Sequence, residues 1–429
     1  MRGVSIKDLI TRKRDGGRIA SAEWRALIKA VVDGDVLDYQ MAALLMAVYL
    51  RGLDDEETAS LTEALAESGE QLPFAPADYV DKHSTGGVGD TVTLVAGPWA
   101  AACGVHIAKL SGRSLGFTGG TIDKLASIPG LRLSLPASEI RRVAEDAGWA
   151  IAQADTVAPA DKYLYALRDA TCTVESIPLI TASVLSKKFA MGAPSLVFEV
   201  TYGSGAFLKS VTEARFLAER LIATSRGRGR AAAAVLVNME QPLGNAVGNA
   251  LEIEEALKTL EGKGPTDLTA ASRAVAAAIF ELAFPERVAE TESLLQEALG
   301  SGEARKRFNA MAELQGAEQG WEERLPRAAY TRDVIADCEG VIARLDAYAV
   351  ARAAGVLGAN RENKTAPLDA AAGIILHKKV GDPVAKGEPI LTLHTNNPKT
   401  FDAAEDWVRR GIEVGHSATG LGVDLTLIR

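Results

Sequence analysis

Residues 105–110 (VHIAKL), 149–152 (WAIA) and 232–237 (AAAVLV) are short apolar runs, and stretches of helical periodicity separate them. Such alternation is typical of βαβ units, in which parallel strands are joined through helices. We therefore expect an α/β domain with a mainly parallel sheet at residues 75–158 and 193–335.

The N-terminal region has a different texture, with the spacing of amphipathic helices. Trp24, Leu27 and Ile28 lie at positions i, i+3 and i+4, a stripe that predicts one buried helix face. A second pair of helices interrupts the α/β pattern at residues 159–192. We expect them to pack on the first helices, which gives a small, discontinuous all-helical domain made of residues 1–70 and 159–192.

The C-terminal region has the pattern of strands. Residues 373–391 hold the turn dipeptides Gly381-Asp382 and Lys386-Gly387 between short apolar runs, which predicts a β-hairpin. We expect a strand-rich α+β part at residues 345–429. Three parts also suit the length, because a single core stops growing near ~250–300 residues and the chain has 429.

The composition excludes several classes of protein. The chain has 47 Lys and Arg against 56 Asp and Glu, a net charge of −9 that argues against nucleic acid and membrane partners. The start lacks the apolar core of a signal peptide, and Pro98 interrupts the most apolar stretch, residues 91–108, which we interpret as a buried helix. Cys103, Cys172 and Cys338 have no disulfide or metal spacing, so we expect buried thiols in a cytoplasmic protein.

Residues 81–93 (DKHSTGGVGDTVT) are the densest chemical signal in the chain. Glycines let backbone N–H groups approach an anion, hydroxyls add neutral donors, Lys82 adds positive charge, and a helix follows. Residues 109–124 (KLSGRSLGFTGGTIDK) repeat this composition after the next expected strand. Either loop alone could be a tight turn, but loops after neighbouring parallel strands face one edge of a sheet. We therefore expect the two loops to hold one oxyanion between them.

A third feature lies on the helices of residues 159–192. Ser183 and Lys187 are four residues apart, on one helix face, and Arg168 lies on the preceding helix. If this face borders the two loops, the three side chains can bind a polar ring; otherwise Arg168 and Lys187 are ordinary solvated surface. Four histidines and the three cysteines have no metal-ligand spacing, and we interpret them as structural or exposed. These histidines are His106, His377, His394 and His416.

Several motifs together resemble the thymidine/pyrimidine-nucleoside phosphorylase family. Residues 82–93 and 109–124 are similar to its two glycine-rich loops, and the similarity extends over nearly the whole chain. The other similar stretches are residues 160–169, 183–188, 203–207, 241–249 and 377–387. The resemblance implies a homodimer whose active site lies in the cleft between the helical and α/β domains.

The resemblance also implies roles for individual residues, position by position. The phosphate ligands would be Lys82, Ser84, Thr93, Lys109, Ser111 and Thr121. The pyrimidine would be bound by His83, Arg168, Ser183 and Lys187, and all of these except Ser183 would act in catalysis. The resemblance implies no organic cofactor, but it does imply a structural potassium or calcium ion. The positions that match the ion's ligands are Gly89, Thr91, Leu243, Ala246 and Glu255.

The implied activity is reversible phosphorolysis of uridine, thymidine and deoxyuridine, with inorganic phosphate as co-substrate and a free base and (deoxy)ribose 1-phosphate as products. Thr93 and Lys109 resemble the branch with broad pyrimidine specificity, and a strictly deoxy-specific thymidine phosphorylase is the alternative. A phosphoribosyltransferase of related fold, with Asp90 and Asp123 as magnesium ligands, is a further alternative. A non-catalytic binding protein is the last.

The sequence departs from the family pattern at five positions. Ser114, Phe117 and Ala126 stand where the family usually has glycine, histidine and glutamate. Glu199 and Thr201 stand where it usually has aspartate and lysine. None of them is an implied ligand, but Phe117 removes a polar group beside the second loop and so bears on domain closure.

Overall fold

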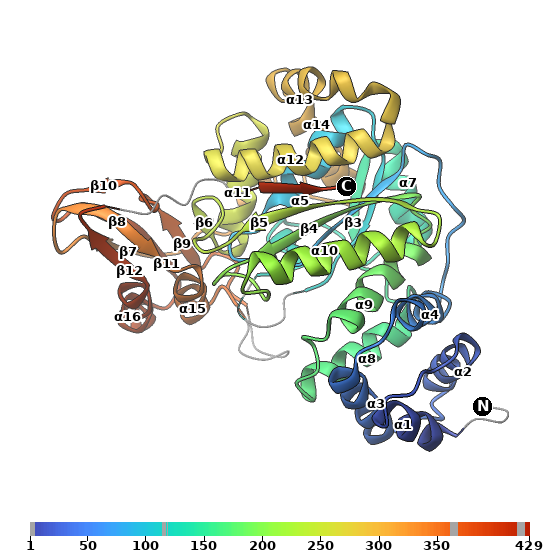
Figure 1. Cartoon of the computed structure of the whole chain (residues 1–429). Coiled ribbons are helices and arrows are strands. Elements are labelled where there is room, and N and C mark those ends of the chain that lie inside the picture. The colour runs from blue at the N-terminus through green and yellow to red at the C-terminus, as the bar shows by residue number, and fades with distance from the viewer. Residues whose placement is uncertain (1–4, 114–116, 118, 361–367, 418–424) are drawn as a thin grey trace.

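The computed structural model describes residues 5–113, 117, 119–360, 368–417 and 425–429. Helices gather at one end of the molecule, the C-terminal strands lie at the other, and the α/β part lies between them (Figure 1). The three apolar cores follow this division: one in the helices, one in the α/β part and one in the C-terminal part. This arrangement confirms the predicted fold class.

Six helices form the helical end. They are α1 (Ile6–Arg14), α2 (Ser21–Val32), α3 (Asp38–Arg51), α4 (Asp55–Ala66), α8 (Pro159–Ala170) and α9 (Ile177–Ala190). Leu164 on α8 and Leu179 on α9 belong to the same buried cluster as Trp24 and Leu27 of α2. The helices of residues 159–192 therefore share a core with the N-terminal helices, although 92 residues separate α4 from α8 in the sequence.

The central sheet is mainly parallel, as predicted. β1 (Val80–Ser84), β4 (Ser195–Tyr202) and β5 (Ala231–Asn238) are parallel, and β13 (Leu425–Ile428) pairs antiparallel with the outer edge of β5. β2 (Ile107–Leu110) and β3 (Trp149–Ala152) form a parallel pair. A parallel bridge from Tyr79 to His106 sets this pair beside β1. The carboxyl ends of β1 and β2 therefore open on the same edge.

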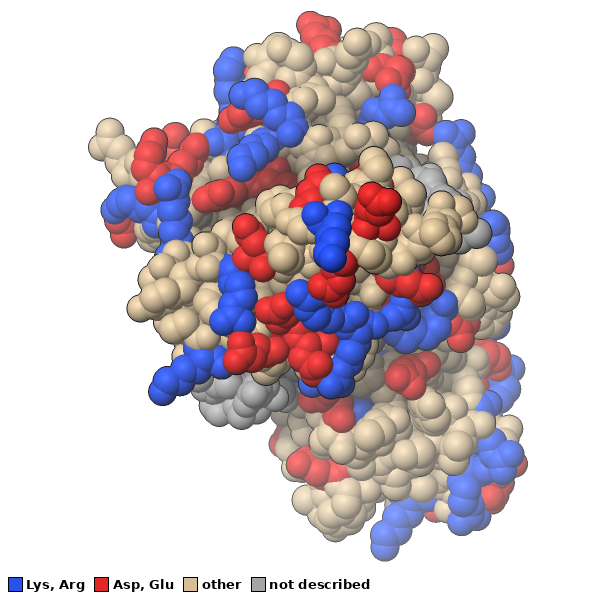
Figure 2. All heavy atoms as spheres, turned by 90° about the vertical axis from the view of Figure 1, so that its left-hand side faces the viewer, with Lys and Arg blue, Asp and Glu red and all other residues tan. Residues whose placement is uncertain are grey.

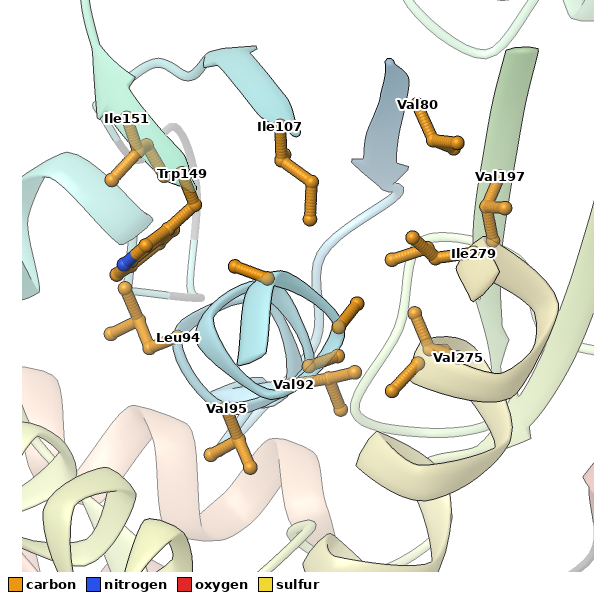
Figure 3. Packing of buried hydrophobic residues seen from close by; sticks show 14 of the residues in the cluster. Val80, Val92, Leu94, Val95, Ile107, Trp149, Ile151, Val197, Val275 and Ile279 are labelled. Atoms are coloured by element: carbon orange, nitrogen blue, oxygen red, sulfur yellow. The ribbon is translucent and has the colours of Figure 1, made fainter. Parts of the chain in front are cut away.

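Helices cover both faces of this sheet. They are α5 (Val92–Ala102), α6 (Thr121–Leu125), α7 (Ala137–Ala147), α10 (Val211–Arg226), α11 (Asn249–Leu260), α12 (Thr266–Ala283), α13 (Thr291–Gly300) and α14 (Glu303–Leu314), with short 3₁₀ turns at Pro285–Glu290 and Glu322–Arg324. The predicted buried helix is α5: Figure 3 shows it surrounded by apolar side chains, among them Ile107 and Trp149 of the strands and Val275 of α12. Gly97 lets α5 pack close to the sheet, because a Cβ there would lie 2.9 Å from the Trp149 ring.

The C-terminal part is built from two small antiparallel sheets and two helices. Its strands are β7 (Tyr330–Ile335), β8 (Gly340–Leu345), β9 (Gly373–Leu376), β10 (Pro383–Val384), β11 (Pro389–Thr395) and β12 (Ile412–Gly415). Its helices are α15 (Ala347–Leu357) and α16 (Phe401–Gly411), with a 3₁₀ turn at Pro398–Thr400. β6 (Ala246–Val247) leaves the α/β part to pair with β9. Over this end of the molecule basic and acidic side chains are interspersed (Figure 2).

Two expectations were wrong in detail. The outer runs of the hairpin expected at residues 373–391 do pair, as antiparallel β9 and β11, but the run between Gly381 and Lys386 does not join them, because β10 pairs with β8. The thiols are free but not all buried: Cys172 and Cys338 are exposed, and only Cys103 is partly buried, where burial raises its pKa to about 11. Across the described ranges, no helix is both long and apolar enough to span a bilayer.

Candidate active site

The carboxyl end of β1 places Lys82 and Ser84 beside the first glycine-rich loop. Lys82 is 2% exposed, and its Nζ donates to Thr93 Oγ1, on the first turn of α5, at 2.6 Å. Ser84 Oγ donates to Asp90 Oδ2 at 2.5 Å and accepts from the backbone N–H of Gly86 at 3.0 Å. The loop thus folds back on the strand end, so that its hydroxyl groups and the lysine lie in one cluster.

Two carboxylates lie among these donors. Glu199 stands opposite Ser84 in the register of β1 and β4, and its Oε2 accepts from Lys82 Nζ. Burial raises the pKa of Glu199 to about 7, and the charge of Asp90 adds to the rise. Burial also favours a higher pKa for Asp90, but Lys82 and Lys124 outweigh this and leave it lowered. Asp90 is therefore the carboxylate that stays charged near neutral pH.

The second glycine-rich loop begins where β2 ends. Lys109 on β2 is 4% exposed, and burial together with the nearby charges of Lys188 and Lys82 holds its pKa well below the ordinary value. The N–H of Ser111 donates to the carbonyl of Ala152 on β3 at 3.0 Å. Thr121 is the first residue of α6. The structure therefore gathers Lys82, Ser84, Thr93 and Lys109, with Ser111 and Thr121 at the two ends of the neighbouring loop.

Helices α8 and α9 carry the residues expected to bind the base. Lys187 Nζ pairs with Asp161 Oδ2 on α8 and also donates to the Ser183 carbonyl at 3.1 Å. The Lys187 side chain is 37% exposed and that of Asp161 only 3%, so a buried carboxylate holds the ammonium group at the tip of a partly exposed lysine. Ser183 is 8% exposed and lies one turn earlier on the same face. The solvated-surface alternative describes Lys187 only in part, because its side chain is 37% exposed but its Nζ is ion-paired.

Arg168 is held by the turn that joins α8 to α9. Its guanidinium donates to the carbonyls of Thr173, Val174 and Leu179 at 3.4, 2.6 and 3.2 Å. The side chain is 2% exposed, and burial lowers its pKa. Arg168 is thus an internal brace of the helical end, and the surface interpretation fails for it.

His83 stands between the loops and the helices. Its side chain is half-buried, and burial together with the charges of Lys188, Lys109, Lys82 and Lys187 lowers its pKa well below 6.5. The imidazole is therefore neutral near pH 7 in this state, with one N–H donor and one nitrogen acceptor. Lysines from both the α/β part and α9 contribute to this shift, so the two groups of candidate residues share one electrostatic environment.

The five positions expected to hold a cation come from three segments. The Leu243 carbonyl lies 2.2 Å from where a Cβ on Gly89 would be, so only glycine permits this approach. Gly244 likewise leaves room for Glu255, whose Oε2 would lie 2.4 Å from a Cβ there. Glu255 Oε1 accepts from Asn245 N at 2.8 Å, whereas Oε2 is buried without a hydrogen-bond partner. Burial raises the pKa of Glu255 to about 7.

The structure fits a hard cation at this place, because an unpartnered buried carboxylate oxygen and nearby backbone carbonyls are ligands that potassium and calcium accept. Thr91 contributes less directly: its hydroxyl donates to the Gly89 carbonyl at 3.1 Å and to Glu252 Oε2 at 3.2 Å. Ala246 begins β6, the strand that joins the C-terminal sheet. In the described part of the chain, no cluster of three or more His, Cys, Asp or Glu side chains offers a metal site of another kind.

Several site residues were missed by the sequence reasoning. Lys124 on α6 donates to the Asp90 carbonyl at 2.5 Å and pairs with Glu252 on α11 at 2.5 Å, which ties the two loops together. Asp161, the partner of Lys187, lies in the stretch of residues 160–169 that resembles the family, but no role was predicted for it. The available signal was position: Lys124 ends the second glycine-rich stretch, and Asp161 lies in the first turn of α8.

The departures from the family pattern find physical partners. Phe117 packs against Tyr348 and Phe207, with ring centroids 5.0 and 5.8 Å away, and so connects the second loop to α15 of the C-terminal part. Thr201 exchanges hydrogen bonds with Thr85, including Thr201 N to Thr85 Oγ1 at 2.9 Å. Ala126 caps the C-terminus of α6, and Ser114 lies outside the described residues.

Comparison with known protein families agrees with this architecture. Residues 7–69 match the helical bundle domain of a glycosyl transferase family, and residues 76–305 match its a/b domain. Residues 341–415 match the pyrimidine nucleoside phosphorylase C-terminal domain. A helical bundle, an α/β domain and this third part together define a glycosyl transferase.

Individual relatives narrow the class. The chain is 43% identical over 97% of its length to a pyrimidine-nucleoside phosphorylase of Staphylococcus haemolyticus, covering 98% of that protein. It is 42% identical over 94% of its length to a protein of the same name from Geobacillus stearothermophilus, again covering 94%. The chain belongs to the pyrimidine-nucleoside phosphorylase family.

A solved structure of another protein has a similar fold. The crystal structure of anthranilate phosphoribosyltransferase from Thermus thermophilus aligns with a TM-score of 0.57 at 21% identity, over 72% of this chain and 99% of that one. At this level of identity the likeness concerns the fold alone.

Proposed function

We propose that this protein catalyses the reversible phosphorolysis of pyrimidine nucleosides, with uridine, thymidine and deoxyuridine as substrates. Phosphate attacks C1′ of the pentose, and the products are the free base and ribose or deoxyribose 1-phosphate. The observation that carries the proposal is the cluster of Lys82, Ser84, Thr93 and Lys109 at the edge of the parallel sheet. It occurs in a chain that is 43% identical to a relative named for this reaction.

Phosphate is assigned to Lys82, Ser84, Thr93, Lys109, Ser111 and Thr121. All are lysines or hydroxyl residues, donors suited to holding and aligning an oxyanion. None is a carboxylate nucleophile of the kind that a two-step route through a glycosyl ester requires. This supports a single displacement with inversion, from a β-nucleoside to an α-pentose 1-phosphate.

The base is assigned to His83, Arg168, Ser183 and Lys187. As the bond to C1′ breaks, negative charge moves onto the departing pyrimidine, so positive charge and N–H donors beside the ring lower the barrier. Lys187 supplies the charge from a side chain that is 37% exposed, and Arg168 acts from the turn that it braces. A neutral His83 donates one N–H to a ring carbonyl, and bound phosphate offsets the neighbouring lysines and raises its pKa.

The domain boundaries given above are part of the proposal. Residues 1–70 and 159–192 would move as one body against residues 75–158 and 193–335, with residues 345–429 as the third part. The shared core of α2, α8 and α9 supports the discontinuous helical body. Because phosphate and base are assigned to different bodies, closure would bring the substrates together and expel water.

A potassium or calcium ion is proposed at Gly89, Thr91, Leu243, Ala246 and Glu255, and it would supply positive charge that fixes the first loop against residues 243–246. The unpartnered Oε2 of Glu255 supports this assignment. No organic cofactor is proposed.

A homodimer in the cytoplasm completes the proposal. Helix α3 leaves Tyr39, Met46, Tyr49 and Leu50 exposed on one face, with Tyr39 at 70% and Leu50 at 71%. Exposed apolar faces of this kind mark protein contacts. The three free cysteines support a reducing compartment.

The testing experiment incubates the protein with uridine, thymidine or deoxyuridine, with and without phosphate and EDTA, and follows release of free base. We expect release that depends on phosphate, survives EDTA and yields the α-anomer by NMR. Thymidine and deoxyuridine cleavage without uridine cleavage would support the deoxy-specific alternative. Magnesium-dependent reaction with a phosphorylated ribose diphosphate would support the phosphoribosyltransferase, and no reaction with any substrate would support a binding protein.

A further inference from the structure

Glu199 occupies an unusual place for a carboxylate, inside the cluster of phosphate donors. Its side chain is fully buried on β4, with Oε2 on Lys82 Nζ and with no hydrogen-bond partner for Oε1. Lys82 is itself 2% exposed and has Thr93 as its other partner. A phosphate ion that takes Lys82 as a ligand therefore shares the single positive charge of this ammonium group with Glu199.

The charges that face Glu199 come from several elements. Asp90, on the first loop, is the nearby negative group. The cations around the cluster are Lys82 on β1, Lys109 on β2, Lys124 on α6 and Lys188 on α9, and His83 lies next to Lys82. Of the helices packed on this face, α5 has no charged residue. The charged residues of α12 form ion pairs elsewhere: Asp267 with Lys379, Arg273 with Glu292 and Glu281 with Arg429.

A phosphate dianion would enter a cluster that already holds two carboxylates. Two carboxylates and a phosphate in one buried site do not all remain ionised, because each negative charge raises the proton affinity of the other two groups. Glu199 already has a pKa raised to about 7, whereas the pKa of Asp90 is lowered. Glu199 is therefore the carboxyl group that accepts a proton first.

We infer that phosphate binds together with one proton, which Glu199 takes up as Lys82 turns from its carboxylate to the phosphate. The bond that forms is O–H on Glu199, the ion pair that breaks is Lys82–Glu199, and the proton comes from solvent. In the ion-paired state Oε1 of Glu199 has no hydrogen-bond partner. Once protonated, the carboxyl group has an O–H that can donate to the phosphate or to Asp90. Glu199 is thus a positioning residue that hands Lys82 to the substrate and holds a proton in the closed site.

This inference rests on the proposed phosphate site, and the test separates the two. Inorganic phosphate is titrated into the protein by calorimetry at about pH 8, where phosphate is mostly a dianion, in two buffers that differ in ionisation enthalpy. The difference between the two heats gives the protons taken up per phosphate. We expect uptake of about half a proton or more for the natural protein and close to none for Glu199→Gln.

Lys109, His83 and the bound phosphate itself are the other groups that could gain a proton here, and the variant distinguishes Glu199 from all of them. Unchanged uptake in Glu199→Gln would assign the proton to one of them and overturn the inference. The matched control is Glu57→Gln, which alters a buried Lys13–Glu57 pair of the helical end (Nζ–Oε2 2.9 Å) and should leave the uptake unchanged. Binding without uptake in the natural protein would sink this inference alone, whereas no phosphate binding at all would sink the phosphate site as well.

A second measurement does not depend on how well the variant folds. Infrared difference spectra of the natural protein, with phosphate minus without, should show a new carbonyl band of a protonated carboxylic acid. Above neutral pH, the affinity for phosphate should fall up to about tenfold per pH unit as the free Glu199 ionises. A spectrum without the carboxylic acid band would overturn the inference.

Discussion

Lys188 on α9 and Asp81 on β1 form an ion pair in the interior, with 2.9 Å between Nζ and Oδ1 and side chains only 2% and 1% exposed. Lys188 Nζ also lies 3.5 Å from the Lys82 carbonyl. The pair therefore joins the helical end to the sheet directly before Lys82, the first residue of the proposed phosphate site. Lys187, the next residue back, pairs instead with Asp161 on α8 and is the lysine proposed to contact the base.

We expect Lys188→Met to lower the free energy of unfolding by about 3–5 kcal/mol, because it leaves Asp81 as a buried charge without a partner. The double variant Asp81→Asn with Lys188→Met should be clearly more stable than Lys188→Met alone. Urea unfolding of the single and double variants measures this. Additive losses would show that the pair does not couple the helix to the sheet.

Lys187→Gln should lower kcat by about 10²-fold or more, since it removes the positive charge beside the leaving base. The variant should also be less stable than the natural protein. Asp161 is buried and loses its ion-pair partner, so the melting temperature should fall. Lys162→Gln is the matched control, because Lys162 on α8 pairs with exposed Asp155 and should affect neither quantity. Turnover close to that of the natural protein would return Lys187 to a structural role.

Stability should fall as pH rises from about 4.5 to 7, in part through Glu255. The folded-state pKa of Glu255 is raised to about 7, so the folded protein binds a proton in this window that the unfolded chain has lost. Its contribution is favourable at the low end and disappears as the pH rises through the folded pKa. Potassium or calcium should restore the melting temperature at pH 8 by pairing with the carboxylate.

Glu255→Gln should abolish that cation effect and flatten part of the pH dependence. Thermal melts of both proteins between pH 5 and about 8, with and without each ion, make the comparison. Glu199 titrates in the same window, so some pH dependence will remain in the variant. A cation effect of equal size in Glu255→Gln would place the ion elsewhere.

Leu50→Gln, combined with Tyr39→Ser, should shift the protein from dimer to monomer, because both side chains are exposed on α3. Sedimentation equilibrium gives the oligomeric state. Val288→Gln is the control: Val288 is also apolar and exposed, at 42%, but lies on the 3₁₀ turn after α12. A dimer that both the variant and the control retain would exclude the α3 face as the contact.

Local pattern explains why much of the fold was predictable. β3 was bounded correctly at Trp149–Ala152, and β5 extends one residue beyond each end of its predicted run. The run of residues 383–384 was assigned to a hairpin because turn dipeptides report local reversal, whereas its pairing with β8 is decided by packing of the C-terminal part. The exposure of Cys172 and Cys338 was not predicted, because composition and spacing do not say whether a residue lies at the surface of the fold.

The candidate site, too, was predictable only in part. Its donors were identified because lysine, hydroxyl and glycine residues crowd two short stretches. Their partners were not, because Lys82 meets Glu199 across 117 residues of sequence and Lys188 meets Asp81 across 107. No local pattern carries such a pairing. The electrostatics of the site, including the raised pKa of Glu199 and the lowered pKa of His83, follow from these distant partners.

The central sheet includes one strand, β13, that is synthesised long after the strand with which it pairs. β13 completes the edge of the central sheet at residues 425–428, yet β5, its partner, ends at residue 238. During synthesis the C-terminal part therefore emerges while one edge of β5 still has unpaired backbone groups, which is an opportunity for wrong strand pairing. The outer edge of β5 is therefore paired only after the C-terminal part has been synthesised, so completion of the central sheet depends on a segment far along the chain.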